Sequence, residues 1–265
     1  MNYMKGIKSI VLLAIFSIGM AACEKKPDPA TTPTPTPTPT TGNGEVGFEF
    51  ANMAGGSELV FNTGSYTNAA GETFTVSKFN YYITNIKLKK ADGSEYAEPE
   101  SYHLVEGDVA ASRHFHIKNV TKGTYTSASF MIGVDEPRNT SGAQTGALDP
   151  AKGMFWSWTT GYIMAKLEGT SPAATTTDKK FVHHIGGFNG ANSSLRTVTI
   201  TFPQPMEVSS AKELSIKLKA DVLKWFAPGN VTIAANSTLM GVNTTSKTVA
   251  DNYANMFSIS SIVLE

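Results

Sequence analysis

Two tryptophans and two histidines stand out as residues whose types and spacing could support metal chemistry. Trp156 and Trp158 are separated by one residue, so on a β-strand both side chains would lie on the same face. His183 and His184 are adjacent, so a strand would direct them to opposite faces, and at most one would enter a given site. Imidazole nitrogen suits copper and zinc. The alternative interpretation is a core stripe of tryptophans and a strand-end histidine bonded to backbone.

A second pair of histidines, His114 and His116, has the spacing of one face of a strand. Their side chains would be separated by about 7 Å along the strand, close enough to share a copper or zinc ion. Lys118 follows on the same face, which favours a solvated surface instead. Both interpretations of this pair remain open.

The segment 133–161 is a polar stretch that leads into an aromatic strand. Long ordered loops of this kind often carry function. We expect Asp135, Asn139, Asp149 and Met154 to line a site there, with Met154 on the same strand face as the two tryptophans. The carboxylates could bind a hard cation through oxygen, but their spacing is not specific for one.

Motifs typical of enzymes are missing from the sequence. It contains no phosphate-binding glycine loop, no G-x-S-x-G, no H-E-x-x-H, no calcium-binding loop of the EF-hand type and no C-x-x-C. No combination of nucleophile and base stands out, so we expect a protein that is not an enzyme. The 22 basic and 22 acidic residues balance, without a block of like charge, which gives no support for nucleic acid binding.

The elements that would position these residues are mostly β-strands. Runs with alternating apolar and polar residues are separated by Gly-containing turn signals, a pattern that predicts an all-β, antiparallel β-sandwich with long loops. One or two short helices are also expected, over Ala220–Phe226 and around Ala250–Met256. The clearest strand-like runs are Val46–Phe50, Phe79–Lys89, Tyr125–Val134, Thr197–Phe202 and Leu214–Lys219.

Strict alternation along Phe79–Lys89 predicts two faces. One face would carry the odd-numbered residues and the other the even-numbered residues. The first set is Phe79, Tyr81, Ile83, Asn85, Lys87 and Lys89, and the second is Tyr82, Thr84, Ile86 and Leu88.

The N-terminal segment has the features of a lipoprotein signal. Lys5 and Lys8 precede a short apolar run, and two alanines precede Cys23, the only cysteine of the chain. We therefore expect a signal peptide over residues 1–22, and a lipidated Cys23 followed by a Thr/Pro-rich tether over residues 23–43. An ordinary signal peptide with an incidental cysteine is the alternative.

The mature protein would then be a membrane-anchored lipoprotein of the bacterial cell envelope, at the periplasmic face or on the outer surface of the outer membrane. Its partner would be the membrane, through the lipid anchor. The functional domain would occupy residues 44–265. Four lysines and two acidic residues precede this domain, which leaves it with a small net negative charge.

The domain resembles the MbnP-like copper-binding family. The resemblance rests on GVD, GALDP, GMFWSWTTGYIMAKLEG and HHIGG, with FNYYITNIKL upstream and ADVLKWF downstream. It covers most of residues 45–260, and the block from Gly153 to Gly169 is its most specific part. Many relatives are lipoproteins, and others are encoded with methanobactin or with a di-haem cytochrome c peroxidase-like partner.

The resemblance implies a particular copper site. In copper-binding members, the di-haem partner oxidises one tryptophan to kynurenine, whose amine binds copper together with histidine imidazoles. Carried over to this chain, the tryptophan is Trp156 or Trp158, and the histidine is His184, with His183 as the further candidate. Those members also tend to carry a histidine beside the tryptophans and another in the preceding loop. Here the corresponding regions contain Phe155, Ser157 and the triplet 138–140.

Two functions follow from these observations. The first is non-catalytic copper binding at the cell envelope, through a histidine and a kynurenine-modified tryptophan. The second is a metal-free surface binding module that uses the aromatic loop as its contact patch. The two functions can be distinguished by structure, because copper binding requires His184 to lie within coordination range of the strand face that carries Trp156 and Trp158.

Overall fold

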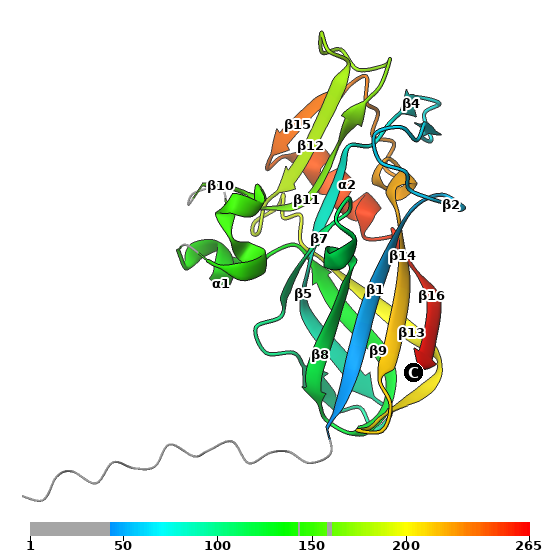
Figure 1. The fold of residues 1–265 in the computed structure, drawn as a ribbon. Helices are drawn as coiled ribbons and strands as arrows, with labels where there is room; N and C mark the ends of the chain where they lie inside the picture. The colour runs from blue at the N-terminus through cyan, green and yellow to red at the C-terminus, as the bar shows by residue number, and fades with distance from the viewer. Residues whose placement is uncertain (1–42, 143, 158–160) are drawn as a thin grey trace, which may run out of the picture. The chain divides into compact units, whose positions relative to one another are not determined.

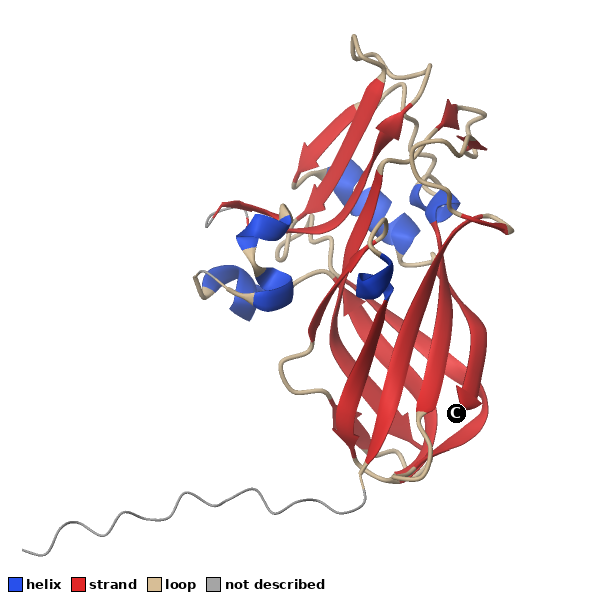
Figure 2. Ribbon diagram, in the orientation of Figure 1, coloured by secondary structure: helices blue, strands red, loops and turns tan. Residues whose placement is uncertain are grey.

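The computed structural model describes residues 43–142, 144–157 and 161–265. Within these ranges strands predominate and helices are few and short, so the predicted all-β sandwich is confirmed (Figures 1 and 2). The five strand-like runs of the sequence all form strands. No helix among the described residues is long and apolar enough to cross a membrane.

The smaller of the two main sheets contains five of the described strands. Its order is β16 (Phe257–Leu264), β14 (Leu214–Asp221), β1 (Gly44–Ala54) and β2 (Ser57–Glu58), and β8 (His114–Val120) also pairs with β1. The first strand of the domain therefore lies inside this sheet. It runs parallel to β14 and antiparallel to β2 and β8.

The larger sheet contains nine of the described strands and carries the candidate site. Its order is β13 (Arg196–Val208), β9 (Gly123–Ile132), β5 (Lys78–Lys90), β11 (Gly161–Thr170), β12 (Lys180–Gly186) and β15 (Thr238–Gly241). The short strands β6 (Glu95–Ala97) and β7 (Tyr102–Glu106) pair with β5, and β10 (Phe155–Ser157) pairs with β11. All pairs are antiparallel except β12 with β15.

The remaining elements are small. β3 (Tyr66–Thr67) and β4 (Thr73–Phe74) form a separate hairpin. The α-helices are α1 (Glu136–Thr140) and α2 (Thr244–Tyr253). Single 3₁₀ turns occur at η1 (Ala110–Arg113), η2 (Gly146–Leu148), η3 (Pro150–Lys152) and η4 (Val222–Trp225). The first expected helix is thus a 3₁₀ turn whose N-cap, Asp221, accepts a hydrogen bond from the Leu223 amide at 3.0 Å. The second begins earlier than expected, at Thr244.

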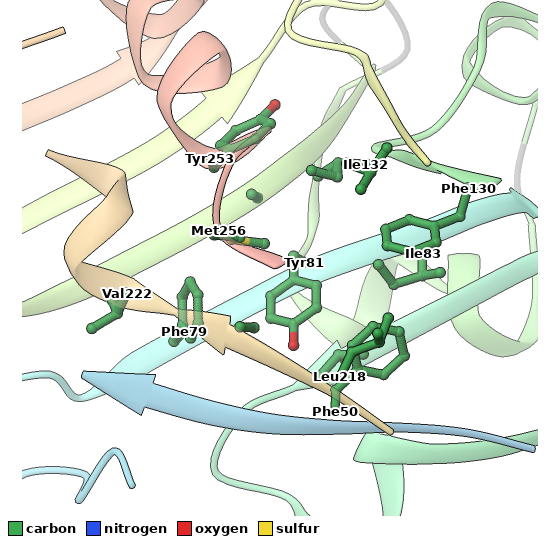
Figure 3. Packing of buried hydrophobic residues seen from close by; sticks show 14 of the residues in the cluster. Phe50, Phe79, Tyr81, Ile83, Phe130, Ile132, Leu218, Val222, Tyr253 and Met256 are labelled. Carbon is green, nitrogen blue, oxygen red and sulfur yellow. The ribbon is translucent and has the colours of Figure 1, made fainter. Parts of the chain in front are cut away.

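The main core lies between the two large sheets and is rich in aromatic rings. Phe50 of β1 faces Tyr81 of β5 and Phe130 of β9 across this core (Figure 3). A second, smaller apolar cluster covers the other side of β5 and β11, beneath the loop 133–161. Its buried members are Tyr82, Leu104, Val134, Leu148, Met154, Tyr162, Ile163 and Met164. Where the two clusters lie on opposite sides of the sheet, β5 and β11 are therefore buried on both faces.

The strict alternation predicted for β5 is wrong beyond Thr84. Phe79, Tyr81 and Ile83 face the main core, but the next core residues are Ile86 and Leu88. The register with β9 shifts between Thr84 and Lys87. Asn85 adopts a φ of +51° at this point, a left-handed conformation that asparagine tolerates better than most residues. The resulting β-bulge exchanges the two faces of the strand.

Candidate metal centre

Strand β12 directs its two histidines to opposite faces, as their adjacency predicts. His183 points into the main core with Phe181 and Ile185, and its side chain is fully buried. His184 lies on the other face together with Gly186. The two imidazoles therefore meet different surroundings and cannot contribute to one site.

His183 has both ring nitrogens engaged within the core. Its Nδ1 accepts a hydrogen bond from Trp225 Nε1 at 3.0 Å. Its Nε2 therefore carries the ring proton and donates to the Asn236 carbonyl at 2.6 Å. Burial lowers the pKa of His183 to about 4, so the ring is neutral at physiological pH. With both nitrogens occupied, His183 offers no lone pair to a metal.

His184 has one nitrogen engaged and one free among the described residues. Its Nε2 lies 2.7 Å from Glu168 Oε1 on β11. Because a carboxylate only accepts, Nε2 carries a proton, and in the neutral ring Nδ1 therefore keeps a lone pair. The hydrogen bond from His184 lowers the pKa of Glu168, which stays ionised. Nδ1 is buried and has no hydrogen-bond partner in the described part of the chain.

Trp156, on β10, reaches the same face of β12. A Cβ atom added to Gly186 would lie 2.2 Å from Cζ3 of the Trp156 ring, so the indole occupies the space left by the missing side chain. Gly186 is two residues from His184, so the two positions are about 7 Å apart along the same face of the strand. Trp158, the other candidate tryptophan, lies outside the described residues.

Two further side chains flank His184 on neighbouring strands. Met240 of β15 is its register partner and is 50% exposed. Lys166 of β11 is its partner on the other side, and its Nζ donates to the Gly153 carbonyl at 2.6 Å. Burial lowers the pKa of Lys166. The thioether of Met240 is a soft ligand of the kind that Cu(I) prefers.

The loop residues predicted to line the site instead hold the loop in place. Asp135 accepts hydrogen bonds from Asn85 Nδ2 at 3.0 Å and from the Tyr102 hydroxyl at 2.9 Å. Asn139 is buried, and its Oδ1 accepts from the Tyr162 amide at 2.8 Å, which ties α1 to β11.

Asp149 and Met154 complete this set. The Asp149 carboxylate caps η3 by accepting from the Ala151 amide at 2.8 Å. Met154 is fully buried in the smaller apolar cluster. Asp149 and Met154 thus anchor the segment that leads into β10.

His114 and His116 of β8 lie close to a third potential metal ligand, Glu213, which the sequence did not indicate. The ligand atoms of His114, His116 and Glu213 all lie within 4.8 Å of one another. Within the described residues, this is the one group of three or more His, Cys, Asp or Glu side chains that converges in this way. No local sequence signal links Glu213 to the pair, because its proximity depends on two long-range strand pairings.

The donors around His184 fit a copper ion. A free imidazole nitrogen, backed by a carboxylate on the other ring nitrogen, is the arrangement that metal-binding histidines usually show. Met240 adds a soft sulfur on the same face, and Trp156 lies against the strand next to them. The described residues contribute a single histidine here, which is fewer than the resemblance implies.

Comparison with known proteins places the domain in a family. The sequence profile of the MbnP family matches residues 43–245. The structure of MbnP from Methylosinus trichosporium is similar with a TM-score of 0.50, at 14% sequence identity, over 69% of this chain and 77% of that one. No curated protein matches the sequence. The profile match covers most of the chain and agrees with the fold, so the chain belongs to the MbnP family.

Proposed function

We propose that this protein binds copper without catalysing a reaction, and that His184 is its central ligand. The observation that carries the proposal is the buried Nδ1 of His184, which has no partner among the described residues, while Glu168 fixes the proton on Nε2. This carboxylate both orients the ring and raises the basicity of the free nitrogen. Imidazole nitrogen is a good copper ligand.

Two further ligands are proposed from the same face of the sheet. Met240 supplies a thioether from the strand next to His184. Trp156 supplies nitrogen after oxidation to kynurenine. Two equivalents of peroxide add two oxygen atoms across the indole C2–C3 bond and break it, and water then releases C2 as formate. The net change is a gain of one oxygen and a loss of one carbon, and it exposes an aniline amine that the indole lacks. A di-haem peroxidase-like partner would carry out this oxidation. The soft sulfur and the single imidazole favour Cu(I) over Cu(II).

The first test is a Cu(I) titration of the mature protein in competition with a chromophoric chelator under reducing conditions. We expect weak binding by protein made without the di-haem partner and tighter binding by protein from its native host. His184→Ala should weaken binding at least about 10-fold, because even the loss of a carboxylate behind a ligand costs 10- to 100-fold. Glu168→Gln and Met240→Leu should each weaken it less.

The matched control is His103→Ala. His103 also pairs with a glutamate, Glu98 at 2.9 Å, but lies on β7, away from this face. Its removal should leave Cu(I) affinity unchanged. Intact mass of the native protein would show whether a tryptophan has lost one carbon and gained one oxygen. Equal Cu(I) affinity of wild type and His184→Ala would contradict the proposal.

That negative outcome would favour a metal-free interaction module. Met240 and Val242 are large apolar side chains exposed by 50% and 46%, respectively. Val242 packs beside Gly187, next to the indole of Trp156 on Gly186. Exposed apolar side chains beside an aromatic ring can form a protein contact surface.

We further propose that the protein is a lipoprotein of the cell envelope, anchored through Cys23 and held by its Thr/Pro-rich tether. Replacing Cys23 with Ser should release the protein from membranes or block its processing, because the acyl chains supply nearly all of the membrane affinity. Membrane fractionation and electrophoretic mobility would measure this. A Cys23→Ser variant that is processed and sediments like wild type would rule out the anchor.

A further inference from the structure

A second group of metal-ligand side chains lies on the five-stranded sheet, separate from β12. His114 and His116 are exposed on β8, and Glu213 directly precedes β14. Neither strand pairs with the other. Both pair with β1, where Gly47 is the register partner of His116 on one side and of Ser215 on the other. The central strand therefore brings Glu213 next to the two histidines, although it is far from them in the sequence.

Gly47 provides the space in which these side chains meet. Val46 and Phe48 point into the core, so position 47 faces outward. A Cβ atom at this position would lie 2.1 Å from Glu213 Oε1 and 3.7 Å from His114 Nε2. The carboxylate of Glu213 thus lies over the bare backbone of β1, where any other residue would place its own side chain.

A fourth ligand is within reach. Glu45 is two residues before Gly47 on the same outward face, and its Oε1 lies 3.1 Å from His116 Nδ1. Glu213 Oε1 also lies 3.1 Å from the same nitrogen. The nearby cation Lys217 is engaged by Glu49 at 3.7 Å and by Glu265 at 3.0 Å. Two imidazoles and the Glu213 carboxylate therefore converge on a small area, and a second carboxylate, Glu45, contacts one of these imidazoles.

The separations between these atoms suit a tetrahedral ion. Metal–ligand bonds of about 2.1 Å at tetrahedral angles place ligand atoms about 3.4 Å apart. The contacts of His116 with the two carboxylates, both 3.1 Å, are already close to that value. Among His114, His116 and Glu213, every separation between ligand atoms is within 4.8 Å, and both histidines are exposed, so small side-chain rotations can close the remaining gaps.

We propose that His114, His116 and Glu213, with Glu45 as a fourth ligand, bind a divalent cation of borderline softness, Zn²⁺ or Cu²⁺. Two imidazoles and carboxylate oxygen form a donor set that such ions accept. Cu²⁺ should bind more tightly than Zn²⁺, in line with the usual order of stability. This site lies on the five-stranded sheet, whereas His184 lies on the nine-stranded sheet. The proposal therefore does not depend on the Cu(I) proposal.

The test is isothermal titration calorimetry of the full mature chain with Zn²⁺ and then Cu²⁺, in a His184→Ala background. This background removes the ligand proposed on β12, so failure at one site can be told from failure at the other. We expect one Zn²⁺ per chain. We expect binding to weaken at least about 10-fold in each of the variants His114→Ala, His116→Ala and Glu213→Gln. Removing a residue that only hydrogen-bonds to a metal ligand already costs about 10- to 100-fold in affinity, and removing the ligand itself should cost no less.

Two further variants make the test specific. Gly47→Ala leaves every ligand in place but adds a methyl group where the Glu213 carboxylate lies, so it should also weaken binding. Glu207→Gln removes an exposed carboxylate of β13 on the larger sheet, and it should bind like the parent. Circular dichroism would verify that each variant is folded. Absence of Zn²⁺ binding by the parent, or unchanged binding by the His114 and His116 variants, would show that these residues form surface ion pairs only.

Discussion

Acidification from pH 7 to pH 4 is expected to lower the free energy of unfolding by about 3 kcal/mol through His183 alone. Its pKa is about 4 in the folded protein because burial disfavours the charged ring, against 6.5 for an unperturbed histidine. Between these values the unfolded chain binds more protons than the folded one, so stability falls as the pH is lowered. The decrease begins near pH 6.5 and is nearly complete at pH 4.

Urea unfolding at a series of pH values would measure this effect, and a His183→Asn variant would isolate it. Carboxylates such as Asp251, whose pKa is lowered by its contacts with Lys247 and Arg196, also titrate in the acid range, and they are common to both proteins. The substituted asparagine cannot be charged, and its amide oxygen can still accept from Trp225. The variant should be less stable than wild type at pH 7, but the difference should narrow by about 3 kcal/mol at pH 4. Parallel pH profiles would contradict the prediction.

Phe50→Ala is expected to destabilise the domain by about 3–5 kcal/mol, the usual cost of removing a buried phenylalanine. The Phe50 ring is 1% exposed and lies between the two large sheets (Figure 3). Its centroid is 6.1 Å from that of Tyr81 and 6.2 Å from that of Phe130 on the larger sheet. The truncation would therefore leave a cavity at the contact between the sheets.

Denaturant unfolding at neutral pH would measure this loss, with Val60→Ala as the control. Val60 is 52% exposed, so its truncation should change stability by no more than about 0.5 kcal/mol. A loss below about 1 kcal/mol for Phe50→Ala would mean that the sheets do not pack through this aromatic group.

Local patterns in the sequence predicted much of the fold. The period-two runs identified five long strands, because alternating burial is a property of each strand by itself. The same rule placed His183 and His184 on opposite faces of β12. It did not reveal which of them faces the core, since that depends on Trp225 and Asn236, which come from segments far along the chain.

The interruption of β5 shows where local patterns become insufficient. Alternation predicts that Asn85 continues the face of Tyr81 and Ile83, yet the strand bulges there. The bulge is held by contacts from other segments: the Asn85 amide donates to the Ser101 carbonyl, and its side chain donates to Asp135. Asparagine permits the left-handed conformation, but the tertiary contacts select it.

The candidate sites were predictable to different extents. The family resemblance led to His184 and to Trp156 or Trp158, and the structure adds Glu168 and the register partner Met240. The pair His114 and His116 was visible as a strand-face pattern. Glu213 was not, because its position over Gly47 requires β1 to pair with β14, and such pairings leave no trace in local periodicity.

The placement of β1 inside its sheet has a consequence for how the domain folds. β1 is the first strand to be synthesised, yet it pairs in parallel along most of its length with β14, near the other end of the chain. Pairing between segments so distant in sequence is slow, because a large loop must close before any contact forms. Until β14 is present, β1 can pair only with β2 and β8, and the smaller sheet stays incomplete. Formation of the complete smaller sheet is therefore coupled to completion of the whole domain.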